Sequence, residues 1–442
     1  MFHVEREALR RILGGEAGPL EAEDAAEHLL ACDRCRAVAG TLLEEFRAAN
    51  HPGLPSGGPL QVVFDVVDRE RQWGVESLTA LAEWAEVRRL PSRRSQRERV
   101  RMAKACHTTD FLKLLLGELK EEAGWEEAEF LASLALLVIE AMHQRRKTTP
   151  HASHDLQAEV WTAVANARRR AAEWRRAHQA LENAERHLKE GTGDLRLKAG
   201  LLSITASTLD DEGHVSQALG ALEECQAIYE SLSEWNLVAR TLVKVANVLE
   251  PIKPDQGLKA LDRALPLIPA ENSFLRLSAD FLRVECLIGM GRPIEALRVF
   301  NRSSPLLASS PRIRPRIRGR FTTARLLDSL GYKQPAERLF DEVVDQDIEH
   351  GLVKDALLDL LYLYERHMKA GDLEKAAQVC RRALSDPALA AAAHEQLQAL
   401  WTLLLEAVAL HPISQDLLSG LRQYVNVHWK HPAATPPWVI AR

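Results

Sequence analysis

Small residues recur in the second part of the chain with a period close to 40. Starting near residue 160, they are separated by 41, 39, 39, 40 and 40 residues. These positions are Ala177, Ala218, Gly257, Ala296, Ala336 and Ala376. An apolar residue generally follows four positions later, at Leu181, Leu222, Leu261, Phe300, Phe340 and Cys380. Residues four apart share one face of a helix, so the pattern predicts an amphipathic helix in every repeat.

Turn residues separate these helices from the ones before them. Glycine precedes the small residue by five positions in four repeats, at Gly213, Gly291, Gly331 and Gly371, and Pro269 follows the third repeat. Glycine and proline at these places end helices. Each repeat is therefore predicted to be a helical hairpin in which the small residue lies on the second helix and allows close crossing.

This pattern resembles the tetratricopeptide repeat, although the period exceeds the usual length of about 34 residues. The resemblance implies an all-α fold, a helix-hairpin solenoid over residues 160–426 that includes a C-terminal cap, and a tail over residues 427–442. Residues 60–159 are predicted to be a helical connector or degenerate repeats. The concave face of such a solenoid typically holds a peptide or a helix.

The N-terminal region carries a separate motif, His28-Leu-Leu-Ala-Cys32-Asp-Arg-Cys35. His28 and Cys32 are four residues apart and can converge on one helix face, while Cys35 falls near the start of a following helix. Two thiolates and an imidazole suit Zn²⁺, which needs a fourth ligand in a structural site. His3 is the candidate, because it is the one other His or Cys before residue 50.

We therefore predict a zinc-stabilised helical module over residues 1–49, followed by a Pro/Gly linker over residues 50–59. A unit of this size buries little surface, so metal binding would supply part of its folding free energy. The alternatives are a chance cysteine pair beside a surface histidine, or a redox pair. The redox alternative is less favoured because no β-α-β pattern surrounds the cysteines.

The residues His3, His28, Cys32 and Cys35 resemble the zinc-binding anti-sigma family, in which a short helical domain carries His-x3-Cys-x2-Cys and an upstream ligand. The resemblance implies that this module and a following helix, here within residues 60–90, sequester a sigma factor. A cap on the repeat array is the alternative role for residues 60–90. Histidine at position 3 removes the third thiol that redox-sensing members use.

Composition and charge narrow the classes of function. The chain has 442 residues, is 46% hydrophobic and has a formal net charge of −5, so it offers no general attraction to nucleic acid. No secretory signal or membrane-length apolar stretch is present, and we expect a cytoplasmic protein without a membrane partner. No sequence motif typical of an enzyme is present, and we therefore expect that the protein is not an enzyme.

Three further groups of residues need an assignment. Cys106, Cys225, Cys286 and Cys380 lie in apolar patterns and are predicted to be core residues. His143, His151 and His154 have no ordered spacing and are predicted in a solvated loop. Two arginine runs, at residues 88–104 and 311–320, are predicted to form solvated faces or inter-repeat salt bridges, or to bind phosphate or carboxylate if unpaired.

Three functions from different classes follow. The first is a zinc-dependent, anti-sigma-like transcription regulator whose repeats bind a second partner. The second is a repeat scaffold or adaptor that holds a protein or peptide, with no sigma factor involved. The third, a nucleic-acid-binding regulator that uses its arginine runs, is the least expected, because interleaved aromatic residues that would stack on bases are absent from the runs.

Overall fold

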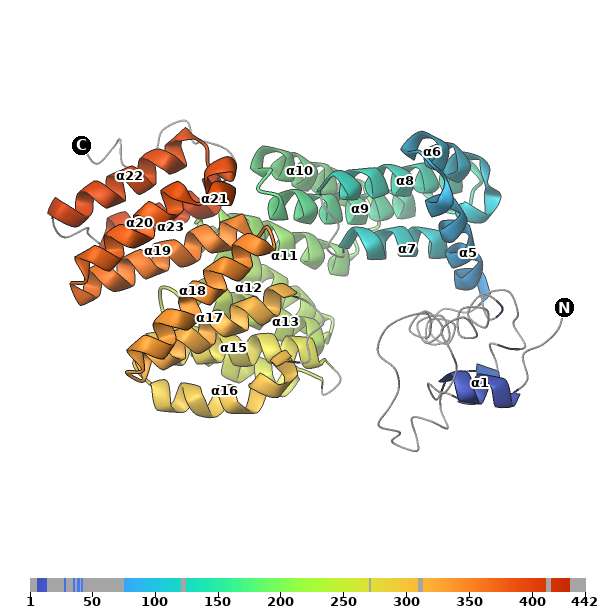
Figure 1. Cartoon of the computed structure of the whole chain (residues 1–442). Coiled ribbons are helices and arrows are strands. Elements are labelled where there is room, and N and C mark those ends of the chain that lie inside the picture. Colours follow the sequence, from blue (N-terminus) through green and yellow to red (C-terminus); the bar gives the residue numbers. More distant parts are fainter. Residues whose placement is uncertain are drawn as a thin grey trace. The chain divides into compact units, whose positions relative to one another are not determined.

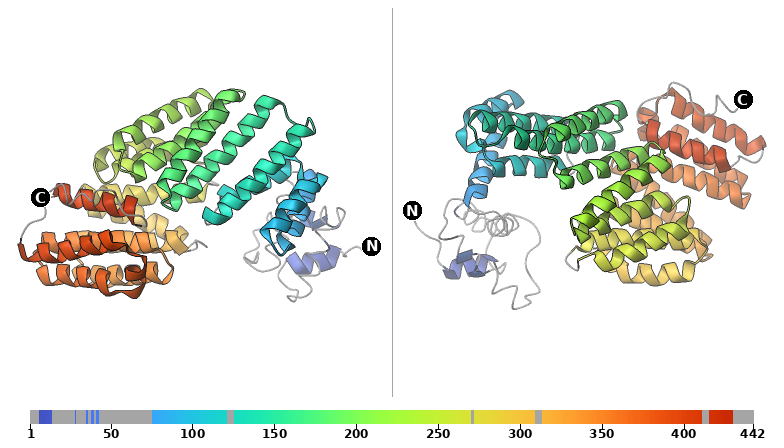
Figure 2. Two further views of the ribbon diagram at one scale, coloured as in Figure 1. Left: turned by 90° about the horizontal axis from the view of Figure 1, so that it is seen from above. Right: turned by 180° about the vertical axis from the view of Figure 1, so that it is seen from behind.

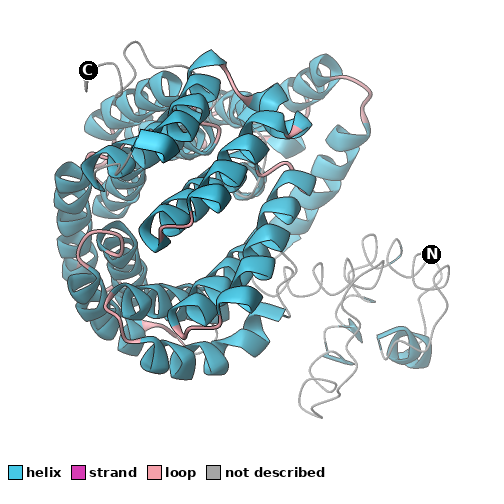
Figure 3. Ribbon diagram, turned by 60° about the vertical axis from the view of Figure 1, so that its left-hand side comes forward, coloured by secondary structure: helices cyan, strands magenta, loops and turns pink. Residues whose placement is uncertain are grey.

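The computed structural model describes residues 6–13, 28, 35, 38–39, 41–42, 75–120, 125–269, 272–308, 313–410 and 415–429, and regular structure in these ranges is helical (Figure 3). The predicted all-α fold is therefore confirmed for the described part of the chain. The chain divides into two compact units, residues 1–167 and residues 168–442, which we call unit 1 and unit 2. None of the described helices combines the length and apolarity needed to cross a membrane.

Unit 1 holds a short N-terminal helix and a group of longer ones. In chain order they are α1 (Arg6–Leu13), α5 (Val75–Arg89), α6 (Arg93–Met102), the 3-10 turn η1 (Lys104–Cys106), α7 (Thr109–Lys120), α8 (Trp125–Gln144) and most of α9 (Pro150–Arg170). Helix α7 packs against α5 and α8, and α6 packs against α8 (Figure 1). The described part of residues 60–159 consists of α5 to α9 and the turns between them, while the predicted linker at residues 50–59 lies outside the described residues.

Unit 2 begins at the end of α9 and is a succession of helical hairpins (Figure 2). The hairpin helices are α10 (Trp174–Glu190), α11 (Leu195–Asp211), α12 (Val215–Ser231), α13 (Trp235–Leu249), α14 (Pro254–Ala264), α15 (Ser273–Gly289), α16 (Pro293–Ala308), α17 (Ile313–Ser329), α18 (Lys333–Glu349), α19 (Val353–Ala370) and α20 (Leu373–Ser385). Helices α11, α13, α15, α17 and α19 each pack against the helix that follows. We call these five the first helices, and the surface they form the first-helix face.

The small residues that reveal the repeat in the sequence occupy one structural position. Each is the fourth residue of its helix and is buried, from Ala177 on α10 to Ala376 on α20. Gly257 shows why the position must be small, since an added Cβ would lie 3.1 Å from Cys286 Sγ and 3.3 Å from the Ala246 carbonyl oxygen. The predicted close crossing on the second helix is therefore confirmed.

The turns that start the second helices also follow the predicted pattern. Gly331 and Gly371 adopt φ values of 91° and 73°, a left-handed conformation that costs glycine little. In the first hairpin Ala172 occupies the same place with φ 58°. The four scattered cysteines are buried, as predicted, and burial raises the pKa of both Cys286 and Cys380 to about 12.

The last helices form the C-terminal end of unit 2. They are α21 (Pro387–Ala392), α22 (Glu395–Leu410) and α23 (Gln415–His428), and the described part of the predicted tail is residues 427–429. Helix α22 packs on α20, while α23 packs on α19 and reaches α11, so it crosses the first-helix face. Its apolar side, including Leu418, Leu421 and Val425, is buried in the core that extends from α17 to α23.

Helix α23 closes the array through side-chain contacts with the opposite end of unit 2. Gln423 Nε2 donates to the Glu212 carbonyl oxygen at 2.8 Å, and Asn426 Nδ2 donates to the Asp211 carbonyl oxygen at 2.7 Å. The Trp174 indole N–H donates to the Val427 carbonyl. The last carbonyls of a helix lack partners within that helix, so two amides of α23 cap the end of α11 across more than 200 residues of sequence.

Candidate functional site

The predicted zinc ligands are described in part. His28 and Cys35 come together, with His28 Nε2 3.2 Å from Cys35 Sγ, and Cys35 is buried. His3 and Cys32 lie outside the described residues. Leu9, Ala39 and Leu42, which also belong to unit 1, are fully buried.

The distance between the two ligand atoms fits a shared metal ion. Tetrahedral zinc with its usual bonds to sulfur and nitrogen places those atoms about 3.5 Å apart. The observed 3.2 Å is close to this value. A buried thiol facing an imidazole therefore matches the donor set that zinc prefers, and the assignment of all four ligands stays a prediction.

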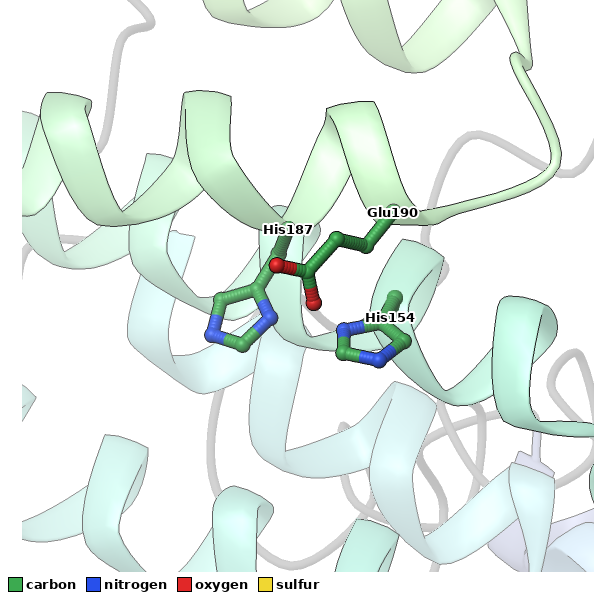
Figure 4. A group of neighbouring side chains, drawn as sticks. All are labelled: His154, His187 and Glu190. Carbon is green, nitrogen blue, oxygen red and sulfur yellow. The ribbon is translucent and has the colours of Figure 1, made fainter.

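The prediction that His143, His151 and His154 lie in a solvated loop is wrong. His143 is in the last turn of α8, and His151 and His154 are on α9. Figure 4 draws His154 with two residues of unit 2, His187 and Glu190, which are three positions apart and project from one side of α10. One histidine and one carboxylate on the same helix supply fewer ligands than a structural zinc site needs, so we assign no metal site to this pair.

The second arginine run forms inter-repeat salt bridges, one of the two structural roles expected for it. Arg314 Nε lies 2.8 Å from Asp355 Oδ2, and Arg318 Nη1 lies 2.8 Å from Asp359 Oδ1, which joins α17 to α19. Arg320 pairs with Glu342 on α18. Arg312 lies outside the described residues.

Further polar contacts between neighbouring first helices follow the same spacing. Arg325 on α17 pairs with Glu285 on α15, and the two residues are 40 positions apart. Lys244 on α13 donates to the Ser203 carbonyl oxygen on α11 at 2.9 Å, a separation of 41 residues. Burial lowers the pKa of Lys244 to about 8, and the positive charge of Arg169 adds to this shift. Polar bonds at about one repeat length therefore join α11 to α13, α15 to α17 and α17 to α19.

Two neighbouring cavities open on this polar surface. The larger, about 950 Å³, lies where α17 and α19 turn into α18 and α20, and we call it the edge cavity. The smaller, about 390 Å³, lies between α17, α19 and α23, and we call it the inner cavity. Tyr362 and Arg422 line both. The edge cavity is lined by seven Lys or Arg residues and four Asp or Glu residues. The inner cavity is lined by four Lys or Arg residues and two Asp or Glu residues. Basic residues are therefore in excess in each cavity.

A pair of carboxyl groups is buried beside the inner cavity. Neither Oδ of Asp347 receives a hydrogen bond from an N–H or O–H group in the described part of the chain, and this residue is fully buried. Burial raises its pKa to about 8, and the nearby carboxylates of Asp359 and Asp355 add to the shift. Burial raises the pKa of Asp359 to about 6 against the opposing effect of Arg318. Of the two carboxyl groups Asp347 therefore holds a proton more readily, and in that form it can donate to Asp359.

The first arginine run, in unit 1, is also paired with acids and aromatic rings. Arg88 lies 2.6 Å from Glu118 and 2.7 Å from Glu127, and Arg99 lies 2.9 Å from Glu83. Arg93 lies 3.2 Å from Glu127, and its guanidinium is 5.1 Å from the centre of the Phe130 ring. These pairings favour the structural role predicted for the run.

The sequence did not point to the acids of the first helices as site residues. Asp355, Asp359 and Glu285 lie on amphipathic helices, where a charge usually belongs to the solvated face. A usable signal was present, because residues of opposite charge are one repeat apart at Arg314 and Asp355 and at Arg318 and Asp359.

No protein-family model matches the chain. No curated protein matches it either. Among solved structures it is similar to the crystal structure of a Rap protein complexed with competence and sporulation factor, with 13% sequence identity and a TM-score of 0.45 over 71% of this chain and 99% of that chain.

Proposed function

We propose that this chain is a non-enzymatic, cytoplasmic interaction protein whose repeat array holds a segment of a protein partner on the first-helix face. The observation that carries the proposal is the pair of neighbouring cavities, the edge cavity and the inner cavity, that α17 and α19 form with α18, α20 and α23. Their volumes fall within or near the range of about 300–1,000 Å³ that is usual for binding pockets. Stacked hairpins offer such a surface on a rigid frame, which limits the ordering cost of binding.

A photo-crosslinking experiment in the native host tests this proposal. Benzoylphenylalanine replaces Gln334, an exposed residue that lines the edge cavity, or Lys259, an exposed residue on α14 outside both cavities. We expect a discrete crosslinked polypeptide from position 334 and none from position 259. Equal crosslinking from both positions, or none from position 334, would contradict the proposal.

We further propose that the N-terminal module holds Zn²⁺ through His3, His28, Cys32 and Cys35 and binds a sigma factor, as in the anti-sigma family that it resembles. The supporting observation is the 3.2 Å contact between His28 and the buried Cys35. When bound, the zinc ion would hold the short helices of the module together. The chain's own residues would then present the binding surface.

Two measurements separate the parts of this second proposal. Metal analysis of the purified protein is expected to find about one zinc per chain, and to find it lost in Cys35→Ser, because a serine hydroxyl is a poor ligand for zinc. Cys106→Ser, at a buried cysteine of unit 1 far along the sequence, is the control. A zinc-loaded protein that retains none of the host's sigma factors would leave the metal site standing and refute the sigma partner.

A further inference from the structure

We infer that the two cavities bind an acidic, extended segment of the partner protein. This inference rests on the proposed function of the repeat array and adds the chemistry of its ligand. The observation behind it is the way the ion pairs that line the cavities are oriented.

In many of these pairs the carboxylate is buried and the basic group is exposed. The Lys369 side chain is 60% exposed, whereas that of its partner Glu365 is 9% exposed. The Arg318 side chain is 45% exposed and that of Asp359 is 3% exposed. Lys333 with Asp328, Arg422 with Glu365 and Arg314 with Asp355 follow the same order. In these five pairs the acid therefore lies deeper than the base that a ligand would meet, whereas Arg366, at 13% exposed, lies deeper than its partner Glu337, at 25%.

The exposed lysines and arginines have N–H donors that are not used in hydrogen bonds to their buried carboxylate partners. A lysine ammonium has three N–H donors and an arginine guanidinium has five. Lys369 Nζ, for example, lies 2.7 Å from one oxygen of Glu365, which leaves its other N–H groups directed elsewhere. Together with the excess of basic residues in each cavity, these donors favour an anionic ligand even though the chain as a whole has a net charge of −5.

The aromatic residues of the cavities favour carboxylates over nucleic acid. Phe321 lies under the Arg318 guanidinium, 4.5 Å from the ring centre, and Tyr362 lies under Arg325 at 5.4 Å. The two rings also meet edge to face, with their centres 5.2 Å apart. Binding of single-stranded nucleic acid commonly uses open aromatic faces for base stacking. Here the rings are engaged by arginines, so the cavities offer charged donors rather than stacking platforms.

The two cavities are placed to act on one ligand. Arg422 on α23 lines both, and its partner Glu365 is buried beneath it. An extended chain repeats its side-chain direction every second residue. A segment with acidic residues at alternate positions can thus direct carboxylates to Lys333 and Lys369 in the edge cavity and to Arg422 between the cavities.

Fluorescence anisotropy with a labelled hexapeptide, three glutamates alternating with alanines, tests the inference on the full chain. The matched probe replaces each glutamate with glutamine. We expect the glutamate peptide to bind at least about tenfold more tightly than the glutamine peptide. Added salt should weaken its binding, because the contacts are ionic. No measurable binding of the glutamate peptide at about 1 mM, or equal binding of the two probes, would overturn the inference.

Variants locate the binding. Lys333→Gln combined with Lys369→Gln is expected to weaken binding about fivefold to tenfold. Lys259→Gln combined with Lys189→Gln removes two similarly exposed lysines of unit 2 outside these cavities and is expected to leave it unchanged. Equal effects of the two pairs would place the peptide elsewhere and refute the inference. Unlabelled single-stranded DNA and unlabelled glutamate peptide can each be added as competitors. If the DNA displaces the labelled peptide at the lower concentration, the ligand is nucleic acid and the inference of an acidic segment is refuted.

The crosslinking experiment at Gln334 distinguishes failure of the acidic preference from failure of the proposed function. A polypeptide that crosslinks there and still binds after its acidic residues are replaced by amides would uphold the proposed function and refute the acidic preference. Absence of any crosslinked polypeptide would remove the proposed function itself.

Discussion

The two arginine runs look alike in sequence and differ in the depth of the acids that they meet. Arg93 in unit 1 lies 3.2 Å from Glu127 and 5.1 Å from the Phe130 ring centre. Arg318 in unit 2 lies 2.8 Å from Asp359 and 4.5 Å from the Phe321 ring centre. The side chain of Glu127 is 30% exposed, whereas that of Asp359 is 3% exposed.

This difference determines what each arginine contributes. A carboxylate that water can reach is solvated with or without its partner, so an exposed ion pair contributes little to stability. A buried carboxylate depends on its partner, and removing that partner leaves an uncompensated charge. Arginine therefore forms weak surface ion pairs in unit 1, whereas in unit 2 it compensates the charge of a buried acid.

The largest expected effect comes from removing the two arginines in turn. Arg318→Met should lower the local stability of α19 by about 2–4 kcal/mol, less than for a fully buried pair because the guanidinium is half exposed. Arg93→Met should lower the local stability of α6 and α8 by less than about 1 kcal/mol. Methionine keeps most of the contact with the phenylalanine ring in both variants. Hydrogen exchange of peptides from these helices measures both effects.

The comparison can also be tested by pH. Because the pKa of Asp359 is raised to about 6, this carboxyl is more readily protonated at about pH 5 than at about pH 8. The cost of Arg318→Met should therefore be smaller at the lower pH. If Arg318→Met and Arg93→Met lower local stability by the same amount at neutral pH, burial of the acid does not determine how much its arginine partner contributes.

The second prediction concerns the carboxyl pair behind Arg318. The raised pKa of Asp347, about 8, means that the folded state binds a proton that the unfolded state releases above about pH 4. The stability linked to this group is complete below that unfolded value and is lost as the pH rises through about 8. The loss is at most about 1.4 kcal/mol per pH unit for one proton.

Asp347→Asn removes this titration and should therefore stabilise the protein relative to wild type by an amount that grows between about pH 5 and about pH 8. The measurement is the free energy of unfolding from urea titrations across this range. Asp345→Asn changes an exposed carboxylate on the same helix and is the control. A constant difference between Asp347→Asn and wild type at all pH values would contradict a protonated Asp347.

The sequence predicted the repeat well because packing repeats. The close crossing of two helices excludes large side chains at one position in each hairpin, and Ala177 to Ala376 record that exclusion every 40 residues or so. Whether a charged residue is buried or exposed produces no such recurring pattern in the sequence. Asp359 and Glu127 are both acidic residues of helices, and burial of the first depends on how α17, α18 and α19 meet.

The N-terminal site shows the same contrast between local and distant information. The spacing of His28 and Cys35 is local, and their side chains lie together, with His28 Nε2 3.2 Å from Cys35 Sγ. The closing contacts of α23 join residues more than 200 positions apart, and neither Gln423 nor Asn426 belongs to a recurring pattern. Side chains of that kind are identified by the folded chain rather than by periodicity.

The smallest expected effect compares two turn glycines at equivalent places in the array. Gly213 and Gly371 have φ values of 80° and 73°, so alanine costs about 1 kcal/mol at either position. A Cβ on Gly371 would meet no atom within 4 Å, whereas on Gly213 it would lie 2.2 Å from Gln423 Nε2. Gln423 must move away in Gly213→Ala and lose its bond to the Glu212 carbonyl oxygen, which adds about 0.5–1 kcal/mol. Hydrogen exchange in α23 should therefore accelerate in Gly213→Ala and stay unchanged in Gly371→Ala; equal exchange in both would mean that α23 does not depend on this contact.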